Sequence, residues 1–137
     1  MTLEHLQNLV KTNQLKQESR DQREFDGLVE AARLNLTDAK IPKLSKQGQF
    51  KLAYSGAHGF ALAALRWHGY RSDSRFIVFQ CLQHTLKIKP EDWAVLSLCH
   101  KKRNLSEYEG VLDVEDGLLK DLIRMTELLY EKIKQLS

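Results

Sequence analysis

The segment 53-AYSGAHGFALAA-64 decides how the rest of the chain packs. Eight of its twelve residues are Ala, Gly or Ser, and it lies within residues 49–68, where apolar side chains recur at helical spacing. Small side chains let two helix axes approach closely, so this segment is predicted to be a central helix with neighbours on more than one side. Gly56 and Gly59 each cost about 1 kcal/mol of helix propensity, which close packing in the core or at a dimer interface must offset.

Five further helices are predicted on either side of this segment. Apolar spacing places them over residues 3–10, 25–36, 76–86, 90–108 and 114–136. Pro42 ends the second helix, Pro90 and the two acids after it begin the fifth, and Gly110 stops it. Because the connections are short, successive helices should run antiparallel. The predicted fold is all-α, an up-and-down four-helix bundle with one or two additional short helices.

Length and composition indicate one folded domain of 137 residues, with 42% hydrophobic and 28% charged residues. Only seven glycines and two prolines argue against a β-sandwich, and no repeat suggests a solenoid. Residues 1–23 are predicted to form a peripheral helix and a hinge, and residues 24–137 the bundle. The hinge prediction comes from the polar run between Lys16 and Glu24.

The net charge of +3 is unevenly distributed. Residues 40–75 carry seven bases against Asp73 alone, whereas the last helical segment is acidic. This arrangement suits an anionic ligand on one face, antiparallel packing of subunits, or separate solvated helix faces. The N-terminus lacks a basic region followed by an apolar run, and no apolar stretch is long enough for a bilayer. A cytoplasmic protein with Cys81 and Cys99 as buried thiols is therefore expected.

Four polar residues of the fifth helical segment share one face about 100° wide. They are His100, Arg103, Asn104 and Glu107, and the opposite face is largely apolar. A helix with this composition is a candidate for carrying an active face. The alternative interpretation is that Arg103 and Glu107 form only a surface ion pair four residues apart.

The stretch 102-KRNLSEY-108, which follows 99-CHK-101 late in a predicted bundle helix, resembles the HEPN superfamily. That superfamily consists of all-α bundles whose signature is an arginine, a polar residue that is often asparagine, a few more residues and a histidine. The resemblance extends over residues 24–137, including the helix order and the helix of small residues. It implies a homodimer acting in a toxin–antitoxin, defence or RNA-processing system, with a minimal nucleotidyltransferase as a possible partner. Active members cleave RNA without metal.

Carried over by this resemblance, Arg103 matches the signature arginine and Asn104 the polar residue, but Tyr108 stands where histidine is expected. A phenol with a pKa of about 10 is a poor base at neutral pH, whereas imidazole titrates near 6.5. The prediction is therefore a protein that binds RNA or a nucleotidyltransferase and is catalytically weak or inactive. Two alternatives remain: a metal-independent ribonuclease that uses Arg103 with His100 or His84, and a non-catalytic scaffold or dimerisation module.

The candidate site residues follow from this interpretation. Arg103, Tyr108 and His100 are the candidates for catalysis. The candidates for binding are Asn104, Glu107, Lys102, Arg66 and Arg71, the last two from a basic, aromatic stretch over residues 66–71. No cofactor or metal is expected, because the spacing of cysteines and histidines fits no zinc module and no phosphate-binding glycine loop occurs.

Overall fold

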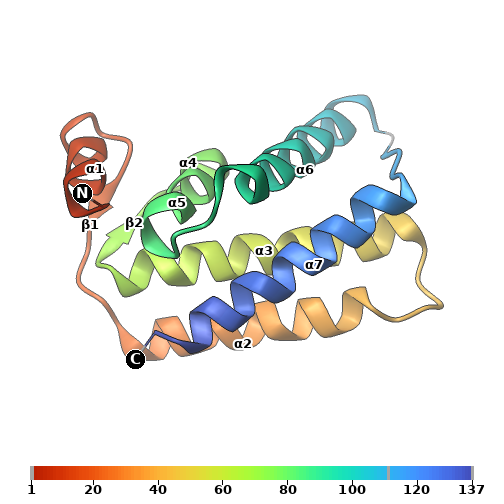
Figure 1. Ribbon diagram of the computed structural model, residues 1–137, viewed down its shortest axis with the longest axis horizontal. Helices are drawn as coiled ribbons and strands as arrows, with labels where there is room; N and C mark the ends of the chain where they lie inside the picture. Colours follow the sequence, from red (N-terminus) through yellow and green to blue (C-terminus); the bar gives the residue numbers. More distant parts are fainter. Residues whose placement is uncertain (1, 111, 137) are drawn as a thin grey trace.

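A long central helix, α3 (Lys46–Trp67), is the axis of the computed structural model, which describes residues 2–110 and 112–136 (Figure 1). The other elements, in chain order, are α1 (Thr2–Lys11), β1 (Lys16–Gln17), α2 (Gln22–Ala39), β2 (Tyr70–Arg71), α4 (Arg75–Gln80), α5 (Leu82–Thr85), α6 (Pro90–Glu109) and α7 (Asp116–Lys134). Helix α3 packs most extensively on α2 and α7, and α6 packs on α7. These four helices alternate in direction, which confirms the predicted all-α, up-and-down bundle (Figure 1).

The close approach of α2 and α3 explains the glycines of the central segment. A Cβ on Gly59 would lie 2.9 Å from the Cβ of Ala32, and one on Gly56 would lie 3.2 Å from the carbonyl oxygen of Ala32. Both glycines therefore bring two helices of the same chain together. The close packing that offsets their low helix propensity occurs in the bundle core.

Gly59→Ala is expected to destabilise the protein by about 1–2 kcal/mol, because the new methyl group forces α2 away from α3 and this outweighs the gain in helix propensity. Gly27→Ala in α2 is the matched control. Nothing lies within 4 Å of a Cβ at Gly27, so this variant should gain up to about 1 kcal/mol. Urea unfolding followed by circular dichroism measures both values. Equal effects from the two substitutions would rule out the packing explanation.

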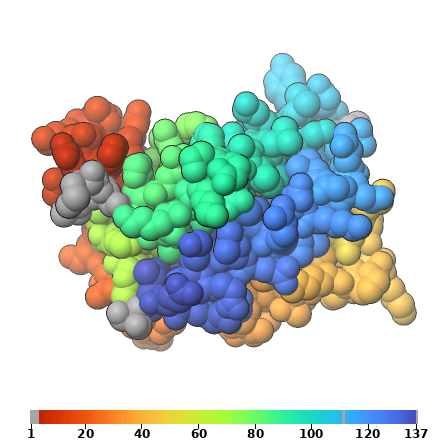
Figure 2. Space-filling model, viewed as in Figure 1, coloured from red at the N-terminus to blue at the C-terminus, as the bar shows by residue number. Residues whose placement is uncertain are grey.

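The N-terminal segment has defined partners where the sequence predicted a hinge. β1 pairs antiparallel with β2, with Lys16 opposite Arg71 and Gln17 opposite Tyr70. Helix α1 packs on α5, and the space-filling view shows this segment against one end of the bundle (Figure 2). Asp21 then caps α2 by accepting hydrogen bonds from two backbone N–H groups. A strand of two residues is too short to leave a periodic pattern in the sequence.

The helix predicted over residues 76–86 is divided into α4 and α5 at Cys81. The ψ of −17° at Cys81 is closer to a 3₁₀ turn than to an α-helix, so the chain changes direction there. Leu82 and Thr85 are buried beyond this turn. The division keeps both halves of the segment against the core.

Arg66 fixes the start of α2 from inside the molecule. This α3 side chain is 1% exposed and donates to Glu24 Oε1 at 2.5 Å and to the carbonyl oxygens of Ser19 at 2.7 Å and Glu18 at 2.8 Å. Arg71 also pairs with Glu24 and Glu18. These contacts join the chain before α2 to the end of α3. The binding role predicted for Arg66 is therefore corrected to a structural one.

Acid is expected to weaken this cluster. The hydrogen bonds from Arg66 and then Arg71 hold the pKa of Glu24 below its ordinary value of 4.5. A carboxylate with a lowered pKa stabilises the fold above its unfolded value, and this stabilisation is lost as the pH falls through the folded value. The melting temperature should therefore fall more steeply below pH 4.5 for the native protein than for Glu24→Gln. Thermal unfolding between neutral and acidic pH measures this, and parallel curves would contradict it.

Candidate functional site

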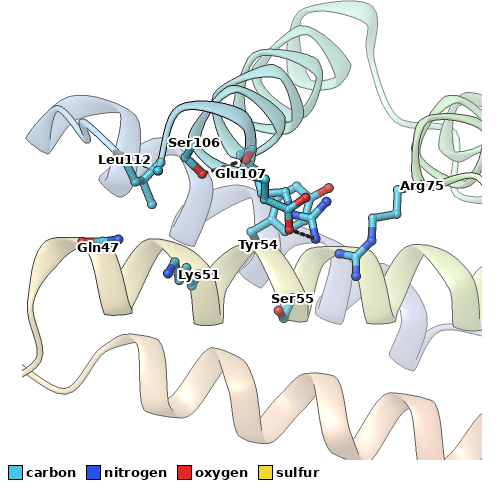
Figure 3. A pocket seen from close by; sticks show the side chains of 10 residues that line it. Gln47, Lys51, Tyr54, Ser55, Arg75, Ser106, Glu107 and Leu112 are labelled. Atoms are coloured by element: carbon cyan, nitrogen blue, oxygen red, sulfur yellow. Dashed lines mark hydrogen bonds and ion pairs between the residues drawn. The ribbon is translucent and has the colours of Figure 1, made fainter.

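A pocket of about 430 Å³ lies between α3 and the C-terminal half of α6 (Figure 3). Arg103, the residue that matches the signature arginine in the sequence analysis, lines this pocket. The full lining consists of Gln47, Lys51, Tyr54, Ser55, Arg75, Arg103, Ser106, Glu107, Gly110 and Leu112. The site thus combines residues from α3, the start of α4, α6 and the segment that follows α6.

Helix geometry explains why α3 and α6 direct these side chains toward the pocket. Leu96 and Cys99 are the buried residues of α6, and the helix ends at Gly110, whose φ of 77° is left-handed. The face beside this buried side carries Arg103 and Glu107 toward the pocket. On α3, Tyr54 and Ser55 come three and four residues after Lys51, so both lie on the same side of that helix as Lys51.

A chain of hydrogen bonds joins the polar residues of α6 to α3. Tyr54 Oη lies 2.9 Å from His100 Nδ1, and Asn104 Nδ2 lies 3.1 Å from His100 Nε2. Arg103 donates to Asn104 Oδ1 at 3.3 Å and pairs with Glu107 Oε1 at 2.7 Å. The four residues predicted to share one face of α6 are therefore connected to one another.

This network assigns the proton of His100. Because Asn104 Oδ1 accepts from Arg103, the amide NH₂ of Asn104 faces His100 and donates to Nε2. A neutral imidazole then carries its proton on Nδ1, which donates to Tyr54 Oη. The hydroxyl proton of Tyr54 is left to donate elsewhere.

The electrostatics of the site favour neutral rings beside fixed cations. Burial lowers the pKa of His100 below its usual value, and Arg103 and Arg75 lower it further. Burial likewise raises the pKa of Tyr54, so its hydroxyl stays protonated. Nearby His58 has a pKa lowered to about 4, mainly by burial. The positive charge of the site therefore comes from arginine and lysine.

Tyr54 is the centre of the cationic side of the pocket. The Cζ atoms of Arg103 and Arg75 lie 5.5 Å and 5.7 Å from the centroid of its ring, and Figure 3 shows Arg75 extending toward it from α4. Lys51 adds a third cation one turn earlier on α3, and Glu107 is the acidic residue in the lining. An arrangement of this kind can hold an anion of about two charges.

Of the predicted site residues, Arg103 and Glu107 line the pocket, and His100 and Asn104 contact them from outside the lining or through one another. Tyr108 is 91% exposed and does not line it, and neither does the half-buried Lys102. Arg66 is buried, and Arg71 pairs with Glu18 and Glu24. The structure therefore brings Arg103, Glu107, Asn104 and His100 together and separates them from these four residues.

His84, the other imidazole considered for cleavage, also lies elsewhere. Its ring stacks on that of His5 in α1, with centroids 4.6 Å apart. It is absent from the lining of the pocket. His84 is therefore not part of the pocket that Arg103 lines.

Sequence reasoning missed three residues of the site. They are Lys51, Tyr54 and Arg75, of which Tyr54 is also a buried residue of the core. The available signal was that Lys51 and Tyr54 are three residues apart on one helix, next to Ser55. Nothing in the sequence indicated that this face of α3 meets the polar face of α6.

The described part of the chain supplies no group of three or more His, Cys, Asp or Glu side chains arranged to hold a metal ion. Across residues 2–110 and 112–136, no helix has both the length and the hydropathy required to span a membrane. Comparisons with protein-family models, curated proteins and solved structures gave no match.

Proposed function

We propose that this protein binds RNA without cleaving it, by holding a phosphate group of the RNA in the pocket between α3 and α6. The observation that carries the proposal is the group of Lys51, Arg75 and Arg103 around Tyr54, with Glu107 as the acidic residue of the lining. Guanidinium groups bind phosphate through paired, charge-assisted hydrogen bonds. The exposed ring of Tyr108, one residue beyond Glu107, is available to stack on an unpaired base.

The state of His100 favours binding over cleavage. Metal-independent cleavage needs a group that takes a proton from the 2′-hydroxyl or gives one to the leaving oxygen. Both ring nitrogens of His100 are already hydrogen-bonded, to Tyr54 and Asn104, and the ring is not part of the pocket lining. Its role in the proposal is to position Tyr54 and Asn104. Taken together with the HEPN resemblance, the proposal is that this protein is an inactive, RNA-binding form of that bundle and acts in a toxin–antitoxin or defence system.

Fluorescent single-stranded RNA incubated with the protein in EDTA tests both parts of the proposal. We expect the RNA to bind, to remain uncut on a denaturing gel, and to bind more weakly as salt rises, since phosphate contacts release counterions. RNA cut without metal, with cutting lost in Arg103→Ala, would establish the ribonuclease alternative. No affinity even at low salt would favour the scaffold alternative.

Glu107→Gln is expected to raise the affinity for RNA by about two- to fivefold. The Glu107 carboxylate, which is 61% exposed, forms an ion pair with Arg103 and therefore competes with an incoming phosphate for that guanidinium. Breaking an ion pair with such an exposed partner costs little free energy. Glu109→Gln, on the same helix and outside the pocket lining, is the control for the lost charge. Titration by fluorescence anisotropy measures both variants. Equal gains would mean that only overall charge matters.

The second candidate is protein binding by the outer face of α6, for which we propose a second copy of the chain as the partner. Ala94, Leu98, Leu105 and Tyr108 are all exposed and follow one another at spacings of four, seven and three residues, as in a coiled-coil seam. Light scattering on the native protein and on Leu98→Asp tests this. A native dimer that dissociates in the variant supports the proposal. A native protein that is already monomeric would contradict it and leave this face to another partner, such as the nucleotidyltransferase.

The proposed setting is the cytoplasm. Cys81 and Cys99 are both free and buried. Burial raises the pKa of each thiol to about 12, so both remain protonated and unreactive. Two such thiols are compatible with a reducing compartment.

A further inference from the structure

We infer that the pocket between α3 and α6 recognises a phosphate monoester at an RNA end in preference to an internal phosphodiester. The inference rests on the proposed RNA binding and specifies which part of the RNA occupies the site. A terminal phosphate carries up to two charges and three free oxygens, whereas an internal one carries a single charge.

The charges of the pocket match a dianion. Lys51, Arg75 and Arg103 contribute three positive charges and Glu107 one negative charge, which leaves two. Among the described residues, Arg103 has Glu107 as an ion-pair partner, but no carboxylate pairs with Arg75 or Lys51. Two of the three cations are thus available without breaking an existing pair.

The hydrogen-bond donors match a terminal phosphate as well. Tyr54 Oη accepts from His100 Nδ1–H, so its own hydroxyl proton is available to a ligand oxygen. Burial keeps that hydroxyl protonated by raising the pKa of Tyr54. Arg75 on one side and Arg103 on the other each add guanidinium donors near the same ring. Three free phosphate oxygens give each of these donors an acceptor.

The carboxylate of Glu107 indicates where the ligand binds. It lies 2.7 Å from Arg103 Nη2, within the pocket and near its solvent side, since most of this side chain is exposed. A phosphate that displaces it gains Arg103 as a third cation. A terminal phosphate is attached to the RNA through one ester bond and offers three free oxygens, whereas an internal phosphate is attached through two and offers only two.

The test uses short oligoribonucleotides of one sequence with an internal fluorophore. Their ends are a 5′-phosphate, a 3′-phosphate, hydroxyls only, or a 5′-methylphosphate, which adds a phosphate but only one charge. We expect one or both monoester ends to bind about tenfold more tightly than the hydroxyl and methylphosphate forms. Arg75→Gln should remove this preference, and Arg124→Gln on the exposed face of α7 should keep it.

The outcomes separate this inference from the proposed function. Equal affinities for all four RNAs would overturn the preference for an end and leave RNA binding intact. A preference that persists in Arg75→Gln would also overturn it, because the end would then bind elsewhere. If none of the four RNAs binds, the inference and the proposed function both fail.

Discussion

Arg66→Met is expected to lower the free energy of unfolding by about 3–5 kcal/mol, a large fraction of the stability of a domain of this size. Methionine fills much of the space but donates no hydrogen bond. The carbonyl oxygens of Glu18 and Ser19 would lose their guanidinium partner, and the carboxylate of Glu24 would keep only Arg71. The buried carbonyl oxygen of Tyr70 would lose the Arg66 donor as well, and an unpaired buried acceptor costs far more than the net value of the bond that it made.

Arg23→Met is the matched control for this prediction, since Arg23 is an exposed arginine on α2, one residue before Glu24. This variant should unfold within about 0.5 kcal/mol of the native protein. Urea unfolding followed by circular dichroism gives both free energies. A loss below about 1 kcal/mol for Arg66→Met would mean that the cluster around Glu24 does not hold the N-terminal segment in place.

The second large effect is expected for Arg103→Ala, which should weaken RNA binding by about 10- to 100-fold. A loss of this size corresponds to one or two hydrogen bonds between a guanidinium and a phosphate. The ion pair that this substitution removes is with Glu107, which is 61% exposed, and alanine keeps the helical backbone of α6 intact. The melting temperature should therefore change little while the affinity falls.

Lys101→Ala is the control for this second prediction. It removes the same charge from an exposed position on α6 that does not line the pocket. Its affinity for RNA should fall by no more than about threefold, as expected for an exposed charge that does not contact the phosphate. Arg103→Lys keeps the charge but loses the paired geometry, so it should lie between the two. Equal losses for Arg103→Ala and Lys101→Ala would place the RNA elsewhere.

The helices could be predicted because periodic patterns encode them. The small residues before Arg66 predicted a central helix. The contacts of Gly56 and Gly59 with Ala32 show that α2 is the helix that approaches it there. The short β1–β2 pair could not be predicted, since two residues carry no period. Arg66 was predicted to bind a ligand because the sequence shows where a charge lies along the chain but does not reveal its partners in the fold. Its partners, Glu24 and the backbone before it, are more than 40 residues away in sequence.

The candidate site could be predicted in part, for a related reason. Helical geometry correctly grouped His100, Arg103, Asn104 and Glu107 on one face of α6. The same geometry separates Arg103 and Tyr108 by about 140°, which explains why Tyr108 lies outside the pocket. The residues that α3 contributes depend on how two helices meet, and no pattern within either helix specifies that.

The most direct test of the central claim is a two-dimensional NMR titration of the isotope-labelled protein with a short single-stranded RNA. If the pocket between α3 and α6 binds the phosphate, the largest shifts should arise at Lys51, Tyr54, Arg75 and Arg103. These shifts should disappear in Arg103→Ala and persist in Lys101→Ala. Shifts confined to α2 and α7, or none at RNA concentrations that saturate binding by anisotropy, would contradict the claim.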